Sequence, residues 1–408
     1  MNSLTTLVLL AWRNLFRNPR RTAASLLTVA LGAAGLLIYQ GFNEGIMNQY
    51  RENTIRVRYG HGYVFPKGYY DKKTEEPWKT WISGREDVEK KLKATGQVIE
   101  VFPRLSFYAF LMKGGLTLAG RGEGILPNRE RTFFTAMNFI SGSDLEGSAE
   151  GSDEIILGRG LAESLGLKVG DLVTVLGQTV HGQMNGLELT VRGIFHTGSK
   201  EFDDSFFRID LDRAQSLLDT DRVEHFAIQT SGVEAWPTAH AAITAALPEL
   251  DAKPFDDLDA VYYKNAVKFL ESQFSFIRSI MLLIVALGIF NTIAVGLLER
   301  AGEVGALRAN GESRGRLFRI LLCESAFLGV AGGIVGIVIA VLLDRLAFRS
   351  GIPMPPGPGI TREFRIFLEI QGQHYLQALL LPAVTTVIAS LIPIVRLVRK
   401  SIPELLRS

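Results

Sequence analysis

The sequence predicts an α-helical membrane protein with four transmembrane helices and a large α+β extracytoplasmic domain inserted between helices one and two. Three observations support this fold class. Four apolar runs are each long enough to cross a hydrocarbon core of about 30 Å at 1.5 Å per residue. Residues 46–270 contain no such run and mix strand-like with helix-like patterns. Clusters of basic residues flank the apolar runs in a way that favours one orientation across the bilayer.

The apolar runs define the predicted spans, because only helices satisfy every backbone hydrogen bond within lipid. The first span and the start of a stalk occupy residues 22–45, and the other three spans belong to a C-terminal domain over 271–408. These three spans cover about 274–298, 321–343 and 376–398. Glycine and alanine are frequent in the spans. Two explanations stay open, namely ordinary membrane-helix composition and close helix packing.

Residues 1–21 precede the first span and predict a short amphipathic helix on the cytoplasmic side, in the headgroup region. Trp12 and Phe16 alternate with arginines, and Pro19 separates this helix from the span. A cleaved signal peptide is the alternative. Its apolar core would be about 7–15 residues long, whereas this run is nearer to twenty, so we expect an uncleaved anchor.

The positions of the basic residues predict the topology. One cluster precedes span one, a second lies between spans two and three, and a third follows span four. All three face the cytoplasm if both termini are inside, which places residues 46–270 outside. Arg345, Arg349, Arg362 and Arg365 in the last outer loop are the one cost of this assignment.

Within residues 46–270, several segments have clear local patterns. Residues 98–118 predict two strands joined by a turn at 113–115. Residues 154–175 predict a strand, a short helix with a glycine cap, a turn and a second strand. Residues 211–218 predict a helix capped by Asp210 or Asp212. The alternating elements indicate an α+β domain.

Several function classes find no support in the composition. The net charge is +2 and no basic stripe is interleaved with aromatic residues, so we expect no nucleic-acid partner. Cys323 is the single cysteine, and the six histidines lack metal-ligand spacing, so we predict no disulfide, metal or cofactor. Residues 193–200 imitate a phosphate-binding loop, but Ser199 precedes Lys200 in the wrong order. The chain is therefore not expected to be an enzyme or an ATPase.

The short stretch between spans two and three is the candidate functional segment. Its charged and small residues have near-helical spacing, and Gly311 is placed to end a helix in a left-handed conformation. The candidate residues are Glu299, Arg300, Glu303, Val304, Gly305, Ala306, Leu307, Arg308, Ala309 and Gly311. One interpretation is an ordinary charged loop on the cytoplasmic side. The other is a helix that docks on a soluble partner.

These residues, with Glu324 early in the next span, resemble the coupling segment of the FtsX/MacB/LolC family of ABC-transporter permeases. The opening over residues 10–22, the stretch 154–175 and the tail 402–407 are also similar to that family, although Ser401 replaces the usual aspartate. The resemblance implies four helices and a periplasmic domain between the first two. It also implies a separate cytoplasmic ABC ATPase dimer that contacts residues 299–311, which we term the coupling segment.

The resemblance further implies a bacterial inner-membrane protein that pairs with a second copy or a sister permease and contacts membrane lipids. The periplasmic partner would be a cargo, a chaperone or an adaptor. Residues 190–198 with 203–205 resemble the lipoprotein-releasing subunits, which favours lipoprotein transport toward the outer membrane. Residues 176–187 hold no long proline-containing insertion of the kind that captures the lipoprotein chaperone in one such subunit, so direct hand-off is not implied. Two alternatives are an efflux permease with an adaptor and an FtsX-like activator of a cell-wall hydrolase.

Overall fold

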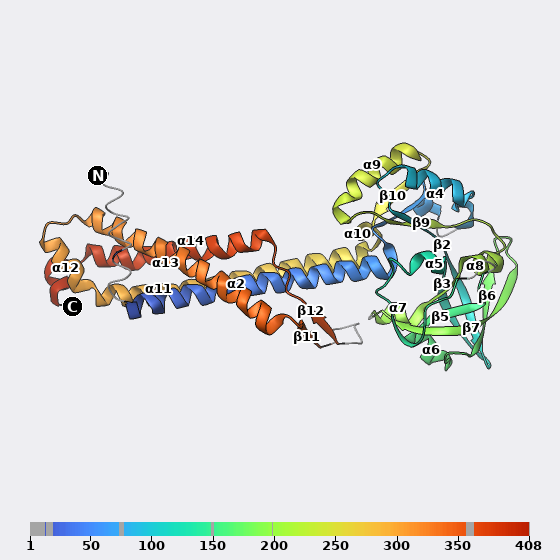
Figure 1. Cartoon of the computed structure of the whole chain (residues 1–408), viewed down its shortest axis with the longest axis horizontal. Helices are drawn as coiled ribbons and strands as arrows, with labels where there is room; N and C mark the ends of the chain where they lie inside the picture. Colours follow the sequence, from blue (N-terminus) through green and yellow to red (C-terminus); the bar gives the residue numbers. More distant parts are fainter. Residues whose placement is uncertain are drawn as a thin grey trace. The chain divides into compact units, whose positions relative to one another are not determined.

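The computed structural model of the chain describes residues 13, 19–72, 77–147, 151–197, 199–355 and 363–407 (Figure 1). Most of the helix predicted over residues 1–21 lies outside these ranges. The chain divides into two compact units. The first, the helical unit, contains Met1–Asn48, Lys268–Met354 and Arg365–Ser408. The second contains Gln49–Val267 and Pro355–Phe364 and is called the inserted domain below.

The helical unit is built on four helices that, among the described residues, are long and apolar enough to cross a membrane. They are α2 (Pro19–Thr54), α11 (Asn265–Glu299), α13 (Arg314–Leu343) and α14 (Gly372–Arg399). Many large apolar side chains on them are exposed, as lipid contact requires, and Leu283 and Val338 are examples. The unit also contains α12 (Ala301–Ala309), α15 (Ile402–Arg407), the π-helical turn η5 (Asp344–Phe348) and a small sheet of β11 (Ile352–Met354) and β12 (Phe364–Ile366).

Glycines on α13 let two neighbouring helices approach closely. A methyl group at Gly329 would lie 2.8 Å from the Cα of Ala383 on α14. A methyl group at Gly336 would lie 2.5 Å from the carbonyl oxygen of Ala30 on α2. Real Cβ atoms do not approach backbone atoms this closely, so these positions require glycine. Close packing within the chain thus explains these two glycines.

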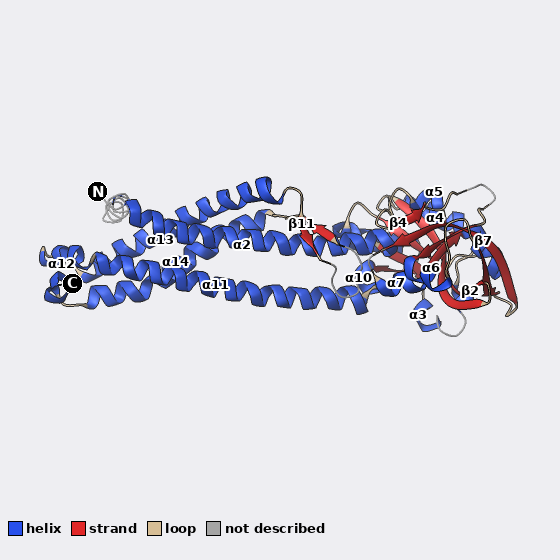
Figure 2. Cartoon of the chain, turned by 90° about the horizontal axis from the view of Figure 1, so that it is seen from below, coloured by secondary structure: helices blue, strands red, loops and turns tan. Residues whose placement is uncertain are grey.

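The inserted domain contains one long mixed sheet (red in Figure 2), in the order β10-β1-β9-β2-β3-β8-β5-β7-β4, with β6 pairing to β2 and β7. The strands are β1 (Gly62–Pro66), β2 (Glu100–Lys113), β3 (Leu116–Ile125), β4 (Asn138–Gly142), β5 (Glu154–Gly158), β6 (Leu172–Gln178), β7 (Met184–His196), β8 (Phe206–Asp210), β9 (His225–Gln229) and β10 (Leu250–Pro254). Most neighbours are antiparallel, while β3–β8 and β5–β7 are parallel. A connection other than a hairpin must therefore link each parallel pair.

Helices flank this sheet and complete an α+β domain. The longer ones are α4 (Arg85–Ala94), α6 (Arg159–Leu165), α8 (Leu211–Leu218) and α9 (Trp236–Ala246), and the shorter ones are α3 (Tyr69–Lys72), α5 (Pro127–Glu130), α7 (Lys200–Ser205) and α10 (Phe255–Leu258). The 3-10 turns are η2 (Pro77–Thr80) and η3 (Val233–Ala235), and the π-helical turns are η1 (Ile55–Tyr59) and η4 (Ala260–Lys264). Leu105, Val175, Phe207 and Ile228 are fully buried in the core between sheet and helices.

Two local predictions in this domain are confirmed. Gly114 and Gly115 form the turn between β2 and β3 with φ of 53° and 88°, a conformation that glycine adopts at least cost. The cap of α8 is Asp210, whose carboxylate accepts a hydrogen bond of 2.9 Å from the backbone N–H of Asp212.

Candidate functional site

The coupling segment folds as the short helix α12, placed between the end of α11 and the start of α13. One face of α12 is buried, with Ala301 fully covered and Val304 only 4% exposed. This face packs against Leu405 of α15 in an apolar cluster that also includes Leu321 and Leu397. The tail of the chain therefore supports the coupling segment from behind.

Gly311 ends α12 in the way that the sequence predicts. Its φ is +92°, and its backbone N–H donates to the carbonyl of Arg308 at 3.1 Å. The N–H of Glu312 reaches back to the carbonyl of Leu307 at 3.1 Å. These two bonds form a Schellman cap, which satisfies carbonyls that a helix end would otherwise leave unpaired.

Arg300 fixes the first turn of α12 to α13. Its Nη1 lies 2.6 Å from Oε1 of Glu324, and its Nε lies 3.3 Å from Oε2 of Glu303. Arg300 is only 8% exposed, so this ion pair is largely shielded from water. Breaking a shielded pair is costly because it leaves a charge without its partner.

Arg308 fixes the last turn of α12 to the end of α14. Its Nη1 donates to the carbonyl of Val398 at 3.5 Å and also to the carbonyl of Lys400. A cation at this place is favourable because the last carbonyls of a helix carry partial negative charge. Arg300 and Arg308 thus tie the two ends of α12 to two different long helices.

The opposite face of α12 is open. Ala306 and Ala309 are exposed, and the side chain of Leu307 is 46% exposed. Glu299 and Gly311 are exposed at the two ends of the segment. The arrangement presents a small apolar surface with an acidic edge, the kind of helix face that fits a groove on another protein.

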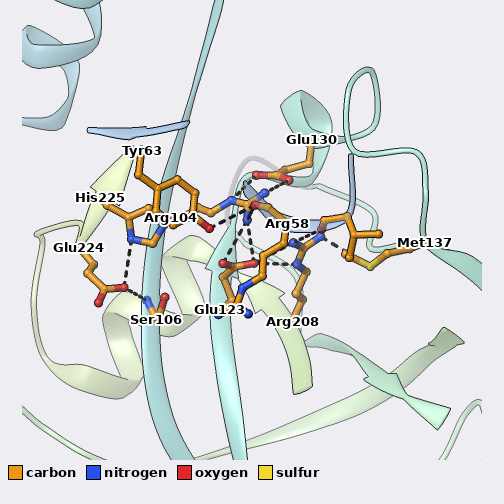
Figure 3. Close-up of polar contacts among 11 residues, drawn as sticks. Arg58, Tyr63, Arg104, Ser106, Glu123, Glu130, Met137, Arg208, Glu224 and His225 are labelled. Atoms are coloured by element: carbon orange, nitrogen blue, oxygen red, sulfur yellow. Dashed lines mark hydrogen bonds and ion pairs between the residues drawn. The ribbon is translucent and has the colours of Figure 1, made fainter. Parts of the chain in front are cut away.

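A second constellation lies in the inserted domain, where the chain arriving from α2 enters it. The π-helical turn η1 follows α2 directly, and its backbone is held by two buried arginines (Figure 3). Arg104 donates to the carbonyl of Arg58 at 2.6 Å, and Arg208 donates to the carbonyl of Val57 at 3.1 Å. We term η1 the connector.

Both arginines share one carboxylate. Glu123 lies 3.2 Å from Arg104 and 2.9 Å from Arg208, and Arg104 also binds Glu130 at 2.8 Å. Arg104 is fully buried, and Glu123 and Arg208 are each 2% exposed. Burial alone would raise the pKa of Glu123, but the two guanidinium groups outweigh it and lower that pKa to about 2. The strands β2, β3 and β8 supply Arg104, Glu123 and Arg208, and α5 supplies Glu130, so the network joins the connector to the centre of the sheet.

Comparison with known proteins places both parts of the chain. Residues 275–402 match the FtsX-like permease C-terminal model, and residues 22–246, more than half of the chain, match the MacB-like periplasmic core domain model. This chain belongs to the FtsX/MacB/LolC family of ABC-transporter permeases. The permease is accordingly a multi-pass inner-membrane protein with a MacB-like periplasmic domain, and its family works with a partner ATPase.

Two curated relatives are similar to most of this permease. The lipoprotein-releasing system transmembrane protein LolC of Neisseria meningitidis serogroup B is 29% identical over 338 residues, covering 79% of this chain and 76% of the relative. The corresponding protein LolE of Haemophilus influenzae is 22% identical, covering 94% of this chain and 93% of the relative. The crystal structure of the periplasmic region of MacB from Actinobacillus actinomycetemcomitans covers 50% of this chain and 94% of its own, with a TM-score of 0.37 and 10% identity.

The structure of the permease distributes the predicted segment residues over two roles. Arg300, Glu303 and Arg308 are engaged within the chain, and Val304 and Gly305 are on the buried face beside Ala301, which was not predicted. The exposed members of the predicted set are Glu299, Ala306, Leu307, Ala309 and Gly311. The sequence reading named Arg300 and Glu324 separately but did not pair them, since they lie 24 positions apart.

Sequence reasoning also missed the network around Glu123. Arg104 stands in β2 among apolar neighbours, in the run Val101–Phe102–Pro103–Arg104–Leu105. A charged residue among apolar neighbours in a strand indicates a buried ion pair, because burying an unpaired guanidinium there would be very costly. Its partner could not be identified without the fold.

Proposed function

We propose that the permease transmits the work of a cytoplasmic ABC ATPase dimer to its periplasmic domain, and that this work releases lipoproteins toward the outer membrane. The observation that carries the mechanism is the coupling segment, which is tied to the long helices at both ends and open on one face. The cargo rests on the likeness to LolC and LolE along most of the chain. In this arrangement both termini lie in the cytoplasm and residues 46–270 lie in the periplasm.

The ATPase docks on the exposed face of α12, with Leu307 as the apolar contact at its centre. The contacts of two arginines explain why a movement of this small helix is transmitted to the membrane helices. Arg300 ties α12 to α13, and Arg308 ties it to the end of α14. A displacement of α12 therefore carries two membrane helices with it, whereas a free loop would absorb the motion.

The connector performs the matching task in the periplasmic domain. Because Arg104 and Arg208 hold backbone carbonyls of η1, tension along α2 is delivered to the sheet rather than lost in a flexible linker. One chain contributes one coupling segment, and an ATPase dimer offers two equivalent docking places. A second copy of this chain or a sister permease occupies the other place.

The docking step is tested by Leu307→Glu in the full-length protein. We expect loss of co-purification with the ATPase after mild solubilisation, because a carboxylate would be desolvated in the apolar contact. The matched control is Leu116→Glu, which changes a similarly exposed leucine (54%) in the inserted domain. Equal recovery of the ATPase with both variants would refute docking through this face.

The cargo is tested by depletion of the permease in its own cells. Lipoproteins destined for the outer membrane should then accumulate in the inner membrane. In the depleted cells, expression of the Leu307→Glu variant should leave this accumulation in place, whereas expression of Leu116→Glu should restore sorting. Unchanged lipoprotein sorting after depletion would contradict the proposed cargo. Recovery of a cell-wall hydrolase or an adaptor on the full-length permease would then favour one of the two alternatives.

A further inference from the structure

A cavity of about 260 Å³ lies in the inserted domain, beside the connector. Its wall is unusually rich in aromatic side chains, contributed by Tyr59, Tyr63, Phe65, Tyr69 and Tyr70. Leu258 and Asp259, which precede the return to α11, also line the cavity. The chain segments that enter and leave the domain therefore both contribute to this cavity.

The aromatic wall is pre-organised. Phe65 and Tyr70 meet edge to face at 5.0 Å, and Tyr69 and Tyr70 do the same at 5.2 Å. Lys253 lies 4.0 Å above the ring of Tyr70, and Arg58 lies 4.9 Å from the ring of Tyr59. Cations of the protein already occupy these ring faces, so the cavity is not an empty cage for a cationic ligand.

The two carboxylates in the wall already have counterparts. Glu224 accepts hydrogen bonds from the Tyr69 hydroxyl, from the backbone N–H of Ser106 at 3.1 Å and from His225 at 3.2 Å. Burial opposes its ionisation, yet these bonds lower the pKa of Glu224 to about 2. It therefore stays charged and fully engaged.

The other carboxylate is Asp259. Burial raises its pKa, and the nearby Arg58 partly offsets that effect. Arg121 is different from both carboxylates. It is half-buried in the wall and makes no hydrogen bond or ion pair with any residue that the structure describes. Arg58, the other guanidinium of the wall, lies over the ring of Tyr59 and near Asp259. Arg121, in contrast, is left without an anionic partner within the described ranges of the chain.

We propose that this cavity binds a small carboxylate with an aromatic or apolar body, either as a free molecule or as the C-terminal residue of a polypeptide. Arg121 receives the carboxylate, since a guanidinium binds both oxygens of such a group at once. The rings of Phe65 and Tyr70 hold the apolar body. A bound ligand contacts Tyr59 of the connector as well, so that occupancy and the conformation of the connector depend on each other.

The size of the cavity agrees with this ligand class. A volume of 260 Å³ corresponds to about nine waters at roughly 30 Å³ each. It falls just below the usual range of small-molecule pockets, about 300–1,000 Å³. One aromatic amino acid fits, whereas a folded partner or a lipid with two long acyl chains does not.

Binding is measured by calorimetry on the full-length chain in detergent, without the ATPase. A lack of ligand binding therefore does not contradict the proposed function, and a failure of ATPase docking does not contradict ligand binding. The probes are N-acetylphenylalanine and its neutral amide, which differ only in the carboxylate. A second pair of probes is a tetrapeptide ending in phenylalanine, with a free or an amidated C-terminus. Tighter binding of the free-acid tetrapeptide than of N-acetylphenylalanine indicates a polypeptide end as the ligand, and the reverse order indicates a free small acid.

We expect the free acids to bind and both amides to bind at least about ten-fold more weakly, as for loss of a charged hydrogen-bond pair. Arg121→Gln should weaken binding of the acids by a similar factor, and Tyr70→Leu should weaken it independently of the carboxylate. Arg159→Gln, an exposed arginine paired with Glu163, is the control and should change nothing. Equal binding of acid and amide, full affinity in Arg121→Gln, or no binding of any probe would overturn the proposal.

Discussion

Replacing Arg300 by methionine tests whether α12 is held as firmly as the structure implies. Methionine keeps most of the length and apolar volume of the side chain but removes the charge. The change deletes both ion pairs, the one of 2.6 Å to Glu324 and the one of 3.3 Å to Glu303. Everything else on the buried face of α12 stays in place.

The magnitude follows from burial. Removing one partner of a fully buried pair costs about 3–5 kcal/mol, because the other charge is left without compensation. The side chains of Arg300 and Glu324 are 10% and 13% exposed, so a value near the lower bound, about 3 kcal/mol, applies. The exposed pair of Arg316 and Glu312, 3.4 Å apart, should contribute less than about 1 kcal/mol.

Hydrogen exchange of the α12 amides measures this cost directly, since protection reports the free energy of local opening. Arg300→Met should accelerate exchange on the order of 100-fold, which corresponds to about 3 kcal/mol. Arg316→Met, the matched control, should accelerate it less than about five-fold. If the α12 amides exchange at the same rate in both variants, the ion pair of Arg300 with Glu324 does not hold α12, and the proposed transmission through α13 is refuted.

Three further predictions concern backbone and charge. Gly311→Ala should raise the exchange rate at the end of α12 about five-fold, because alanine at φ +92° costs about 1 kcal/mol, and unchanged exchange would contradict the cap. Gly336→Ala should lower the melting temperature by several degrees through its clash with Ala30, while Gly372→Ala, which has open space, should not. Folding lowers the pKa values of Glu123 and Glu224 from 4.5 to about 2, so the stability that their ionisation contributes is present above pH 4.5 and is lost as the pH falls toward 2. Tryptophan fluorescence follows that loss, because three of the four tryptophans lie in the inserted domain, and stability that is independent of pH in this range would refute the assignment.

The elements that depend on local pattern were predictable from the sequence. The apolar runs, the glycine turn at 114–115 and the cap at Asp210 each depend on residues that are contiguous in the sequence, so composition and spacing are sufficient to predict them. The strands β4 and β10 are examples of elements that the local sequence pattern does not predict. Both strands are short. The sequence of β4, which includes Asn138 and Ser141, lacks the alternation of apolar and polar residues that marks a strand. Pairing with β7, rather than local propensity, holds β4 in the sheet.

The candidate site shows the same limit. The position and cap of the coupling segment followed from its own residues. The assignment of each side chain to a buried or an open face did not, because it depends on α15, which comes about a hundred residues later. The contact of Arg308 with Lys400 and the sharing of Glu123 by two arginines are likewise long-range facts.

The way in which the connector is held has a consequence for its sequence. Arg104 and Arg208 grip carbonyl oxygens, and every amino acid supplies a carbonyl. The attachment is therefore indifferent to which side chains occupy positions 57 and 58. The side chain at position 58 is thereby available to line the nearby cavity, as Arg58 does, while its backbone carbonyl holds the connector to the sheet.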